Sequence, residues 1–293
     1  MNTVALELVP PELQAGAGRA IEESRTAAEQ CCRYGLAEHV GHVMIPGIIA
    51  EGEDRPVELT SRMDVLDFWE IIRPSIGTIA GLCTQVTVFL DVEQLATRVQ
   101  RLRDVGLDGI TFVGKPQGLA AVEAPGASPG EAVTRCRSLI PHRGVVLIPT
   151  RRGELGRFAS KCEHGATFAL TQLLYSERIV GFLREFTMRS EHRPEILLSF
   201  GYLPGMEQRV RLIDWLIHDE RNELVRQEQE FVACAASSSQ GKRRRDLVDL
   251  YRRVVDGVHD LGFPLSVHLE APYGVSGPAC ETFAAMLDHW SPR

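Results

Sequence analysis

The feature that most constrains the fold of this chain is a regular alternation of short apolar runs with longer amphipathic segments. Apolar runs of this length, bounded by Gly, Pro and polar residues, are typical of strands that are buried on both faces of a parallel sheet. Eight such runs occur, and they are Val4–Val9, His42–Ile48, Leu82–Phe89, Gly109–Val113, Val145–Pro149, Thr167–Leu174, Ile196–Phe200 and Leu265–Leu269.

Segments with helical spacing separate these runs. They are Ala15–Tyr34, Asp64–Ile72, Val92–Val105, Gly130–Ile140, Ile179–Ser190, Glu207–Ala235, Arg243–Leu261 and a closing segment Gly277–Trp290. Eight strands that alternate with helices predict an α/β fold, a single (β/α)8 TIM barrel over residues 1–293 with extra C-terminal helices. The alternative is a doubly wound open sheet, but no G-x-G-x-x-G follows the first run, so the dinucleotide fingerprint of that fold is missing.

The composition excludes several classes of protein. The 293 residues are 44% hydrophobic and 24% charged, which is ordinary for a globular chain. A formal charge of −7 argues against a general nucleic-acid binder. No apolar run has the length of a membrane span, and Glu7 interrupts the first apolar stretch, so we expect neither a membrane segment nor a signal peptide.

The cysteine pattern points to a cytoplasmic protein without a structural metal. The seven Cys form no C-x-x-C pair, and their number is odd, which fits reduced thiols. No H-E-x-x-H helix occurs either, so we expect no metal site.

Three segments between the predicted elements are distinctive. Glu51–Arg62 and Gly114–Pro129 lengthen the loops after the second and fourth strands, on the side of a barrel where enzymes build their sites. Ser237–Gly241 is predicted to be a flexible connector, and it precedes the basic cluster Lys242–Arg245, which is most simply a solvated helix face.

Glu7 is a carboxylate inside the first apolar run, A-L-E-L-V-P-P. An ionised, unpaired carboxylate is costly to bury, and burial raises the pKa of a carboxyl group, as a general acid working near neutral pH requires. The structural alternative is an internal ion pair or a position that faces solvent at an edge. A closed barrel has no open edge, which favours the functional interpretation.

Other polar side chains fall near the expected carboxyl ends of strands, where a barrel binds its substrate. Alternation places Gln85 and Thr87 on one face of the third strand, and Asp91 follows as a helix N-cap. Paired arginines at a strand end suit phosphate or carboxylate recognition, although a surface turn explains them equally well. The later strand ends supply Thr150, Arg151 and Arg152, then Ser199 and Tyr202, then His268, Glu270 and Tyr273.

The stretch Lys161–Tyr175 reads K-C-E-H-G-A-T-F-A-L-T-Q-L-L-Y. It begins as a charged helix end stopped by Gly165 and continues as an apolar run broken by the pair Thr171-Gln172. Buried amide and hydroxyl groups cost free energy unless they find partners, so this pair near a strand end indicates a site.

Taken together, these motifs resemble the methylenetetrahydrofolate reductase family of (β/α)8 barrels. A-L-E-L-V-P-P resembles the opening strand of the family, and G-A-T-F-A-L-T-Q-L-L-Y resembles its G-A-x-x-x-I-T-Q-x-x-F strand. Lys161 stands four residues before that glycine, where the family also has a lysine. E-I-L-L-S-F-G-Y-L-P stands where members have a strand of I-I-P-G-I-x-P type, and the order agrees over nearly the whole chain.

The motifs that contact flavin in that family differ here. Flavin-containing members have R-G-D at the end of strand four, where this chain has Val113-Gly114-Lys115, and His-Leu-Thr in strand three, where it has Gln85-Val86-Thr87. The tyrosine and histidine of strand five are absent from I-P-T-R-R-G-E-L-G. This pattern, with C-T-Q-V-T and S-V-H-L-E-A, resembles the actinobacterial branch that works without bound flavin, and we favour that branch over an FAD-dependent reductase.

The resemblance implies reduction of 5,10-methylenetetrahydrofolate to 5-methyltetrahydrofolate by NADH or NADPH, in one-carbon metabolism and methionine biosynthesis. It implies that Glu7 donates a proton to N10 and that Gln172 bonds the pterin. Weaker candidates for the same pocket are Gln85, Thr87, Tyr202, His268 and Glu270. Basic or polar candidates for the dinucleotide phosphates or the folate glutamate tail are Thr150, Arg151, Arg152, Lys115 and Lys161.

The alternatives are an FAD-dependent reductase with substituted flavin contacts and a non-catalytic folate or pterin binder. A related barrel reductase that uses another pterin or a deazaflavin is a third. In each case the partners are small molecules, and we expect a cytoplasmic monomer or homodimer.

Overall fold

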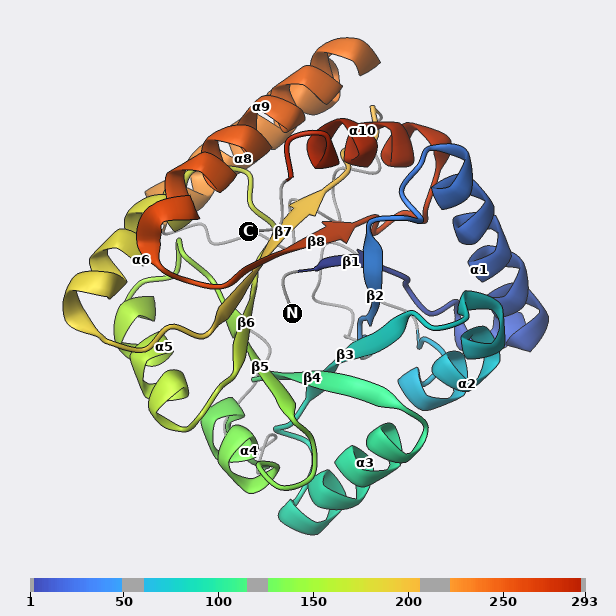
Figure 1. The fold of residues 1–293 in the computed structure, drawn as a ribbon, viewed down its shortest axis with the longest axis vertical. Helices are drawn as coiled ribbons and strands as arrows, with labels where there is room; N and C mark the ends of the chain where they lie inside the picture. The colour runs from blue at the N-terminus through green and yellow to red at the C-terminus, as the bar shows by residue number, and fades with distance from the viewer. Residues whose placement is uncertain (1–2, 49–60, 115–125, 206–221, 291–293) are drawn as a thin grey trace.

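The computed structural model describes residues 3–48, 61–114, 126–205 and 222–290. Its centre is a closed barrel of eight parallel strands, which pair in sequence order (Figure 1). The strands are β1 (Val4–Glu7), β2 (Val40–Ile45), β3 (Ala80–Val86), β4 (Leu107–Val113), β5 (His142–Leu147), β6 (Phe168–Thr171), β7 (Glu195–Gly201) and β8 (Leu265–Glu270). The predicted (β/α)8 barrel is therefore confirmed.

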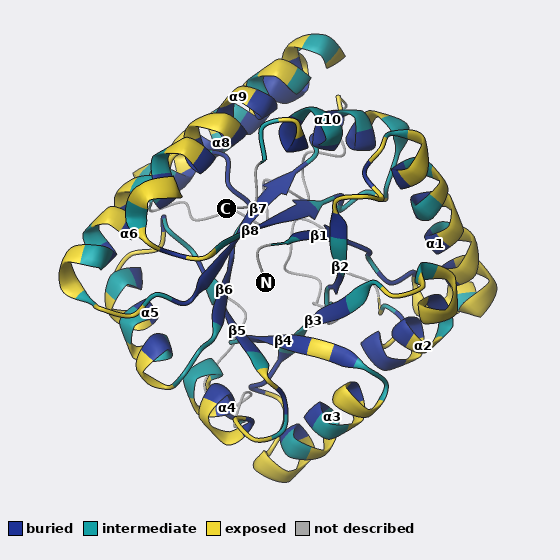
Figure 2. Cartoon of the chain, viewed as in Figure 1, coloured by how far each residue is buried: buried dark blue, intermediate teal, exposed yellow. Residues whose placement is uncertain are grey.

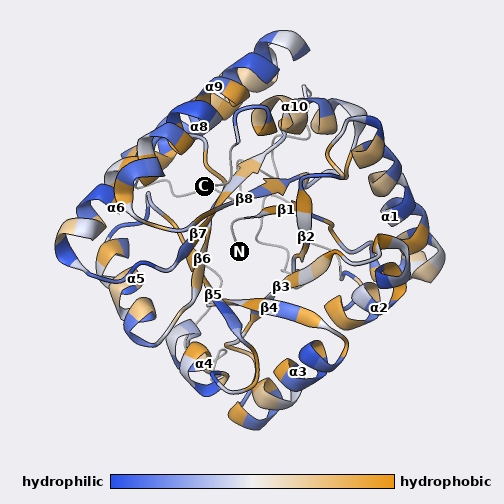
Figure 3. Ribbon diagram, viewed as in Figure 1, coloured by the Kyte–Doolittle hydropathy of each residue, from blue (hydrophilic) through white to orange (hydrophobic). Residues whose placement is uncertain are grey.

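Helices surround this barrel, with their buried faces turned towards the strands (Figure 2). The described α-helices are α1 (Gly16–Arg33), α2 (Val65–Ile76), α3 (Val92–Asp104), α4 (Pro129–Arg135), α5 (Glu154–Glu163), α6 (Arg178–Arg189), α8 (Glu223–Ser237), α9 (Gln240–Val258) and α10 (Gly277–Leu287). Short 3-10 turns η1 (Leu13–Ala15) and η3 (His259–Leu261) precede α1 and follow α9. Figure 3 shows hydrophilic residues along the outer sides of helices such as α1, α3 and α9.

Local sequence signals set several helix boundaries. Asp91 caps α3 in a capping box with Gln94, as its position predicted, and Ser128 with Glu131 does the same for α4. Gly165, at a φ of 95°, follows the end of α5. None of the helices in the described ranges is long and apolar enough to cross a membrane.

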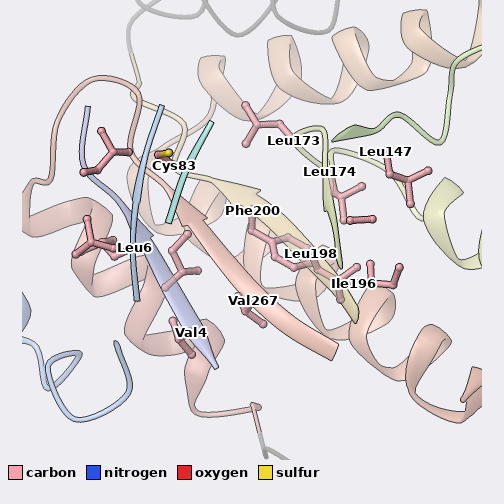
Figure 4. Close-up of a cluster of buried hydrophobic side chains, with 14 of the residues drawn as sticks. Val4, Leu6, Cys83, Leu147, Leu173, Leu174, Ile196, Leu198, Phe200 and Val267 are labelled. Carbon is pink, nitrogen blue, oxygen red and sulfur yellow. The ribbon is translucent and has the colours of Figure 1, made fainter. Parts of the chain in front are cut away.

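The strands divide the apolar residues into two compartments. Outward side chains pack beneath the helices, and Figure 4 shows part of this layer, including Val4, Leu6, Leu198 and Val267. Inward side chains form a smaller cluster inside the barrel, and its buried members are Met44, Leu82, Phe168, Leu170 and Leu197. Because successive strand residues alternate between the two compartments, the outward residues fix which of their neighbours face the barrel interior.

Some predicted segments differ from the structure. β1 ends at Glu7 and β6 at Thr171, both shorter than their apolar runs, although Leu8 and Leu174 still donate backbone hydrogen bonds to neighbouring strands. For α5, the sequence predicted the C-terminal end before Gly165 but not the rest of the helix. The expected connector 237–241 is largely helical, because Ser239 caps α9 directly after α8.

The basic cluster Lys242–Arg245 lies in the first turns of α9, and one of its members is buried. Arg243 is 5% exposed and donates hydrogen bonds to the carbonyls of Ala236 and Ser238. The predicted insertions fall mostly outside the described residues, since 49–60 and 115–125 are not described.

A buried ion pair holds α5 against β5. Lys161 Nζ lies 3.0 Å from Glu154 Oε1 and donates to the Val146 carbonyl at 2.7 Å. The Glu154 side chain is only 1% exposed, and Arg157 Nε lies 2.9 Å from its other oxygen. Lys161 therefore compensates a buried charge within the fold, and the ammonium group we expected to bind a phosphate or carboxylate is occupied by these partners.

The barrel interior leaves no room for a side chain at Gly144. A Cβ atom there would lie 2.2 Å from the ring of Phe168 on the neighbouring strand. We expect Gly144→Ala to lower the free energy of unfolding by about 2 kcal/mol, the usual cost of overpacking a core, as measured by chemical denaturation. Gly181→Ala in α6, where nothing lies within 4 Å, is the control and is expected to be neutral or slightly stabilising. Equal effects at both glycines would contradict this packing.

Removing the lysine of the buried ion pair is expected to destabilise the protein. Lys161→Met leaves Glu154 with one cationic partner and is expected to cost on the order of 2–3 kcal/mol in denaturant unfolding. Arg157→Met is the matched control, because the Arg157 side chain is 41% exposed and water screens its charge. The control is expected to cost less than about 1 kcal/mol. A smaller loss for Lys161→Met than for Arg157→Met would refute a structural role for this lysine.

Candidate active site

Glu7 is the last residue of β1 and faces the barrel interior, because its neighbour Leu6 packs outward. Glu7 is only 8% exposed. The pKa of its carboxyl group is raised well above the usual value, first because burial removes the water that would stabilise the anion, and second because Glu270 adds a like charge nearby. At the mouth of the barrel, this residue favours the protonated form.

A second group of polar side chains faces inward from β7 and β8. His268 is 1% exposed, and its Nδ1 lies 3.0 Å from Ser199 Oγ and 3.2 Å from Glu270 Oε1. The backbone pairing of β7 with β8 sets Ser199 opposite His268. The structure therefore brings His268 and Glu270 together, as their spacing predicted, and adds Ser199 as a partner.

Two tyrosines border this group. Tyr175 is buried, and the pKa of its hydroxyl is raised well above the usual value, mainly by burial and then by the charge of Glu270. Among the described residues, none forms a hydrogen bond with the Tyr175 hydroxyl. The charge of Tyr273, after β8, further raises the pKa of Tyr175. The phenol of Tyr175 therefore remains a neutral donor.

A cavity of about 580 Å³ opens beside Glu7. It lies between the end of β1, helix α1 and the link from β8 to α10, which are neighbours in the barrel (Figure 1). Its charged and polar lining residues include Glu7, Arg19, Glu22, Glu23, Arg62 and Tyr273. Because Glu7 lines the cavity, a molecule bound there can contact its carboxyl group. The cavity is large enough for part of a cofactor-sized ligand.

Two further predicted residues lie at the ends of neighbouring strands. Gln172 directly follows β6 and continues the inward face set by Leu170, while its backbone N–H donates to the Leu147 carbonyl at 2.8 Å. Tyr202 follows β7 and is partly buried against the apolar core, and its backbone N–H donates to the Glu270 carbonyl at 3.0 Å.

Two predicted substrate contacts are directed elsewhere. Gln85 faces outward, because its amide oxygen accepts from Arg98 of α3 at 3.1 Å and its nitrogen donates to the Val86 carbonyl. The Thr87 hydroxyl donates to the Ala127 carbonyl at 2.7 Å. Alternation did place both on one face, but it is the face covered by helices, and partners within the protein occupy both side chains.

The polar and basic residues predicted to bind the cofactor do not form one cluster. Thr150 is buried, and its carbonyl accepts a hydrogen bond from Asn222 at 2.5 Å. Arg151 and Arg152 are exposed in the turn after β5. Lys115 lies outside the described residues, and Lys161 is held in the ion pair with Glu154.

Sequence reasoning missed another buried carboxyl group, Glu228 on α8. It accepts a hydrogen bond from the Ser176 hydroxyl at 2.6 Å, and burial raises its pKa to about 7. Glu228 lies on the buried face of an amphipathic helix, and that position was the one available signal. Within the four described ranges, no three His, Cys, Asp or Glu residues are grouped so as to hold a metal ion.

The arrangement supports acid chemistry beside a bound molecule. A carboxyl group kept protonated near neutral pH can donate a proton, and the conjugate anion can then stabilise a cation formed in the cavity. On the cavity wall, Arg62 and Tyr273 supply hydrogen-bonding groups that can orient a polar ligand.

Comparisons with known proteins identify the family of this chain. A solved structure from Aquifex aeolicus VF5 matches with 13% sequence identity, a TM-score of 0.47, and coverage of 98% of this chain and 90% of the other. No curated protein sequence matches the chain. The family model described as mycobacterial methylenetetrahydrofolate reductase matches residues 1–293. The chain therefore belongs to the mycobacterial methylenetetrahydrofolate reductase family.

Proposed function

We propose that this protein reduces 5,10-methylenetetrahydrofolate to 5-methyltetrahydrofolate by direct hydride transfer from NADH or NADPH. Membership of the family supports a reductase role in folate metabolism. The observation that carries the mechanistic part is Glu7, a buried carboxyl group with a raised pKa at the carboxyl end of a barrel strand, on the wall of the cavity.

The chemistry requires an acid in this position. The methylene group bridges N5 and N10 of the folate, and protonation of N10 opens the five-membered ring to a 5-iminium cation. The proton leaves the Glu7 oxygen as the N10–H bond forms, and the resulting carboxylate stabilises the cation. Hydride from the nicotinamide then reduces the iminium carbon to a methyl group. An acid of normal pKa would be ionised at neutral pH and unable to donate.

Gln172 is the proposed contact to the pterin. It lies on the inward side of β6, and an amide offers both a donor and an acceptor to the polar edge of the pterin ring. His268 is proposed to contact the same substrate, since its Nε2 is buried and has no hydrogen-bond partner in the part of the chain that the structure describes.

Direct transfer means that the dinucleotide and folate occupy the site together. Two reactants held near contact distance gain on the order of 7 kcal/mol or more over encounter in solution, so orientation supplies much of the catalysis. Arg151 and Arg152 are proposed to bind the dinucleotide phosphates or the glutamate tail, since both are exposed after β5.

Removing the proton of Glu7 tests this assignment. Glu7→Gln keeps the shape of the side chain and is expected to retain folate binding while lowering kcat by about 10²–10⁴-fold, the usual contribution of a general acid. Glu29→Gln on the exposed face of α1 is the control and is expected to retain kcat. A Glu7→Gln enzyme with a near-normal kcat would remove Glu7 as the acid.

Direct transfer also predicts the kinetic pattern and the colour of the protein. Initial rates measured at several concentrations of both substrates are expected to give intersecting double-reciprocal lines, because a ternary complex must form. The purified protein is expected to be colourless. Parallel lines, which indicate a carrier reduced and reoxidised in turn, would count against direct transfer. A stoichiometric yellow chromophore would do the same.

A further inference from the structure

Two carboxyl groups meet where the barrel closes. The register of β1 with β8 pairs Ala5 with His268 and Leu6 with Leu269, so Glu7 and Glu270 occupy neighbouring positions at the strand ends. Leu6 and Leu269 both pack outward, which turns the next residue of each strand inward. Like charges this close disfavour ionisation of both groups, so such a pair tends to hold one proton.

The surroundings of the two carboxyl groups differ. Glu270 Oε1 lies 3.2 Å from His268 Nδ1, and that imidazole is positioned by Ser199 Oγ at 3.0 Å. The Glu270 side chain is 14% exposed. The Glu7 carboxyl group, in contrast, is affected mainly by burial and then by the charge of Glu270. The contact with the His268 imidazole therefore distinguishes Glu270 from Glu7 as the carboxyl group whose charge acts on its neighbour.

We propose that Glu270, placed beside Glu7 by the pairing of β1 with β8 and contacted by His268, is a positioning residue that keeps a proton on Glu7. This inference rests on the proposed function, in which Glu7 is the acid. In each turnover the proton leaves Glu7 for N10 and is replaced from solvent through the cavity. Glu270 therefore acts through Glu7 and sets the pH range in which the acid is loaded.

Other ionisable groups near the pair do not reverse this preference. Tyr175 is buried and neutral, as burial raises its pKa, and Tyr273 is a phenol on the cavity wall. Arg62 is a cation on the same wall that favours ionised Glu7, but its guanidinium donates to the Pro10 carbonyl at 3.4 Å.

The remaining charged residues of the cavity wall lie on α1 and bond one another. Arg19 donates to Glu22 at 3.2 Å and to Glu23 at 2.7 Å. Near Glu270 lie the imidazole of His268, the phenol of Tyr175 and the carboxyl group of Glu7. The charge of Glu228 also raises the pKa of Tyr175.

A titration of the ligand-free protein tests the proposal directly. Side-chain carboxyl signals of glutamate labelled with ¹³C are followed by NMR against pH, and the Glu7 signal is assigned from its absence in Glu7→Gln. In Glu270→Gln the Glu7 signal is expected to titrate at lower pH than in the wild type. An unchanged Glu7 titration in Glu270→Gln would overturn the proposal. Neither result depends on whether the protein reduces folate.

Two His268 variants separate the effect of the polar contact between His268 and Glu270 from the effect of packing. His268→Asn keeps an amide nitrogen near the position of Nδ1 and is expected to preserve the Glu7 titration. His268→Leu removes the donor and is expected to move the titration to lower pH, in the same direction as Glu270→Gln. The two variants also keep the proposal testable where Glu270→Gln fails to fold. Identical titrations in both His268 variants would contradict the role given to this donor.

The pH dependence of kcat/KM supplies an independent measurement. In Glu270→Gln the alkaline limb is expected to move to lower pH, with activity reduced more than about tenfold at the alkaline end and little changed at the acidic end. A loss of equal size at every pH would mean a merely structural role and would contradict the proposal. Absence of reductase activity in the wild-type protein would overturn the proposed function, while the NMR titration would still test the carboxyl pair.

Discussion

The pairing of β1 with β8 is the constraint on which the site depends. Those two strands are far apart in the sequence, and their hydrogen bonds close the sheet and bring Glu7 beside Glu270. Without closure, Glu7 would lie on an open edge, where water would stabilise its charge and return the pKa to its normal range. The same closure encloses Ser199 of β7 and His268 of β8.

The site therefore combines a stable frame with one unfavourable feature. The outward layer of apolar residues stabilises the barrel, whereas a buried carboxyl group at the mouth resists ionisation. A protein of this kind gives up some stability at high pH, because the folded chain binds the Glu7 proton more tightly than the unfolded chain does. That cost has the same physical origin as the raised pKa of the Glu7 carboxyl group, which is burial beside Glu270.

The sequence was sufficient for the fold and for part of the site. The spacing and length of the apolar runs predicted all eight strands. The position of Glu7 inside such a run predicted a carboxyl group with a raised pKa. Alternation alone could not tell which face of β3 points inward, so Gln85 was assigned to the pocket although it bonds Arg98. The ion pair of Lys161 with Glu154 joins the two ends of α5 over β5, and neither motif nor spacing reveals such a contact. Glu228 comes to the site region from a distant helix, which only the folded structure could show.

The proposed mechanism requires that folate accept hydride directly from the nicotinamide within this barrel. A single turnover with the dinucleotide carrying deuterium at the transferred C4 position, followed by mass spectrometry of the folate product, measures this transfer. Direct transfer predicts 5-methyltetrahydrofolate with one deuterium in its methyl group for each dinucleotide oxidised. Product that has lost the label to solvent would show an exchangeable carrier between the two substrates and would contradict direct transfer. The absence of any 5-methyltetrahydrofolate would contradict the reductase function itself.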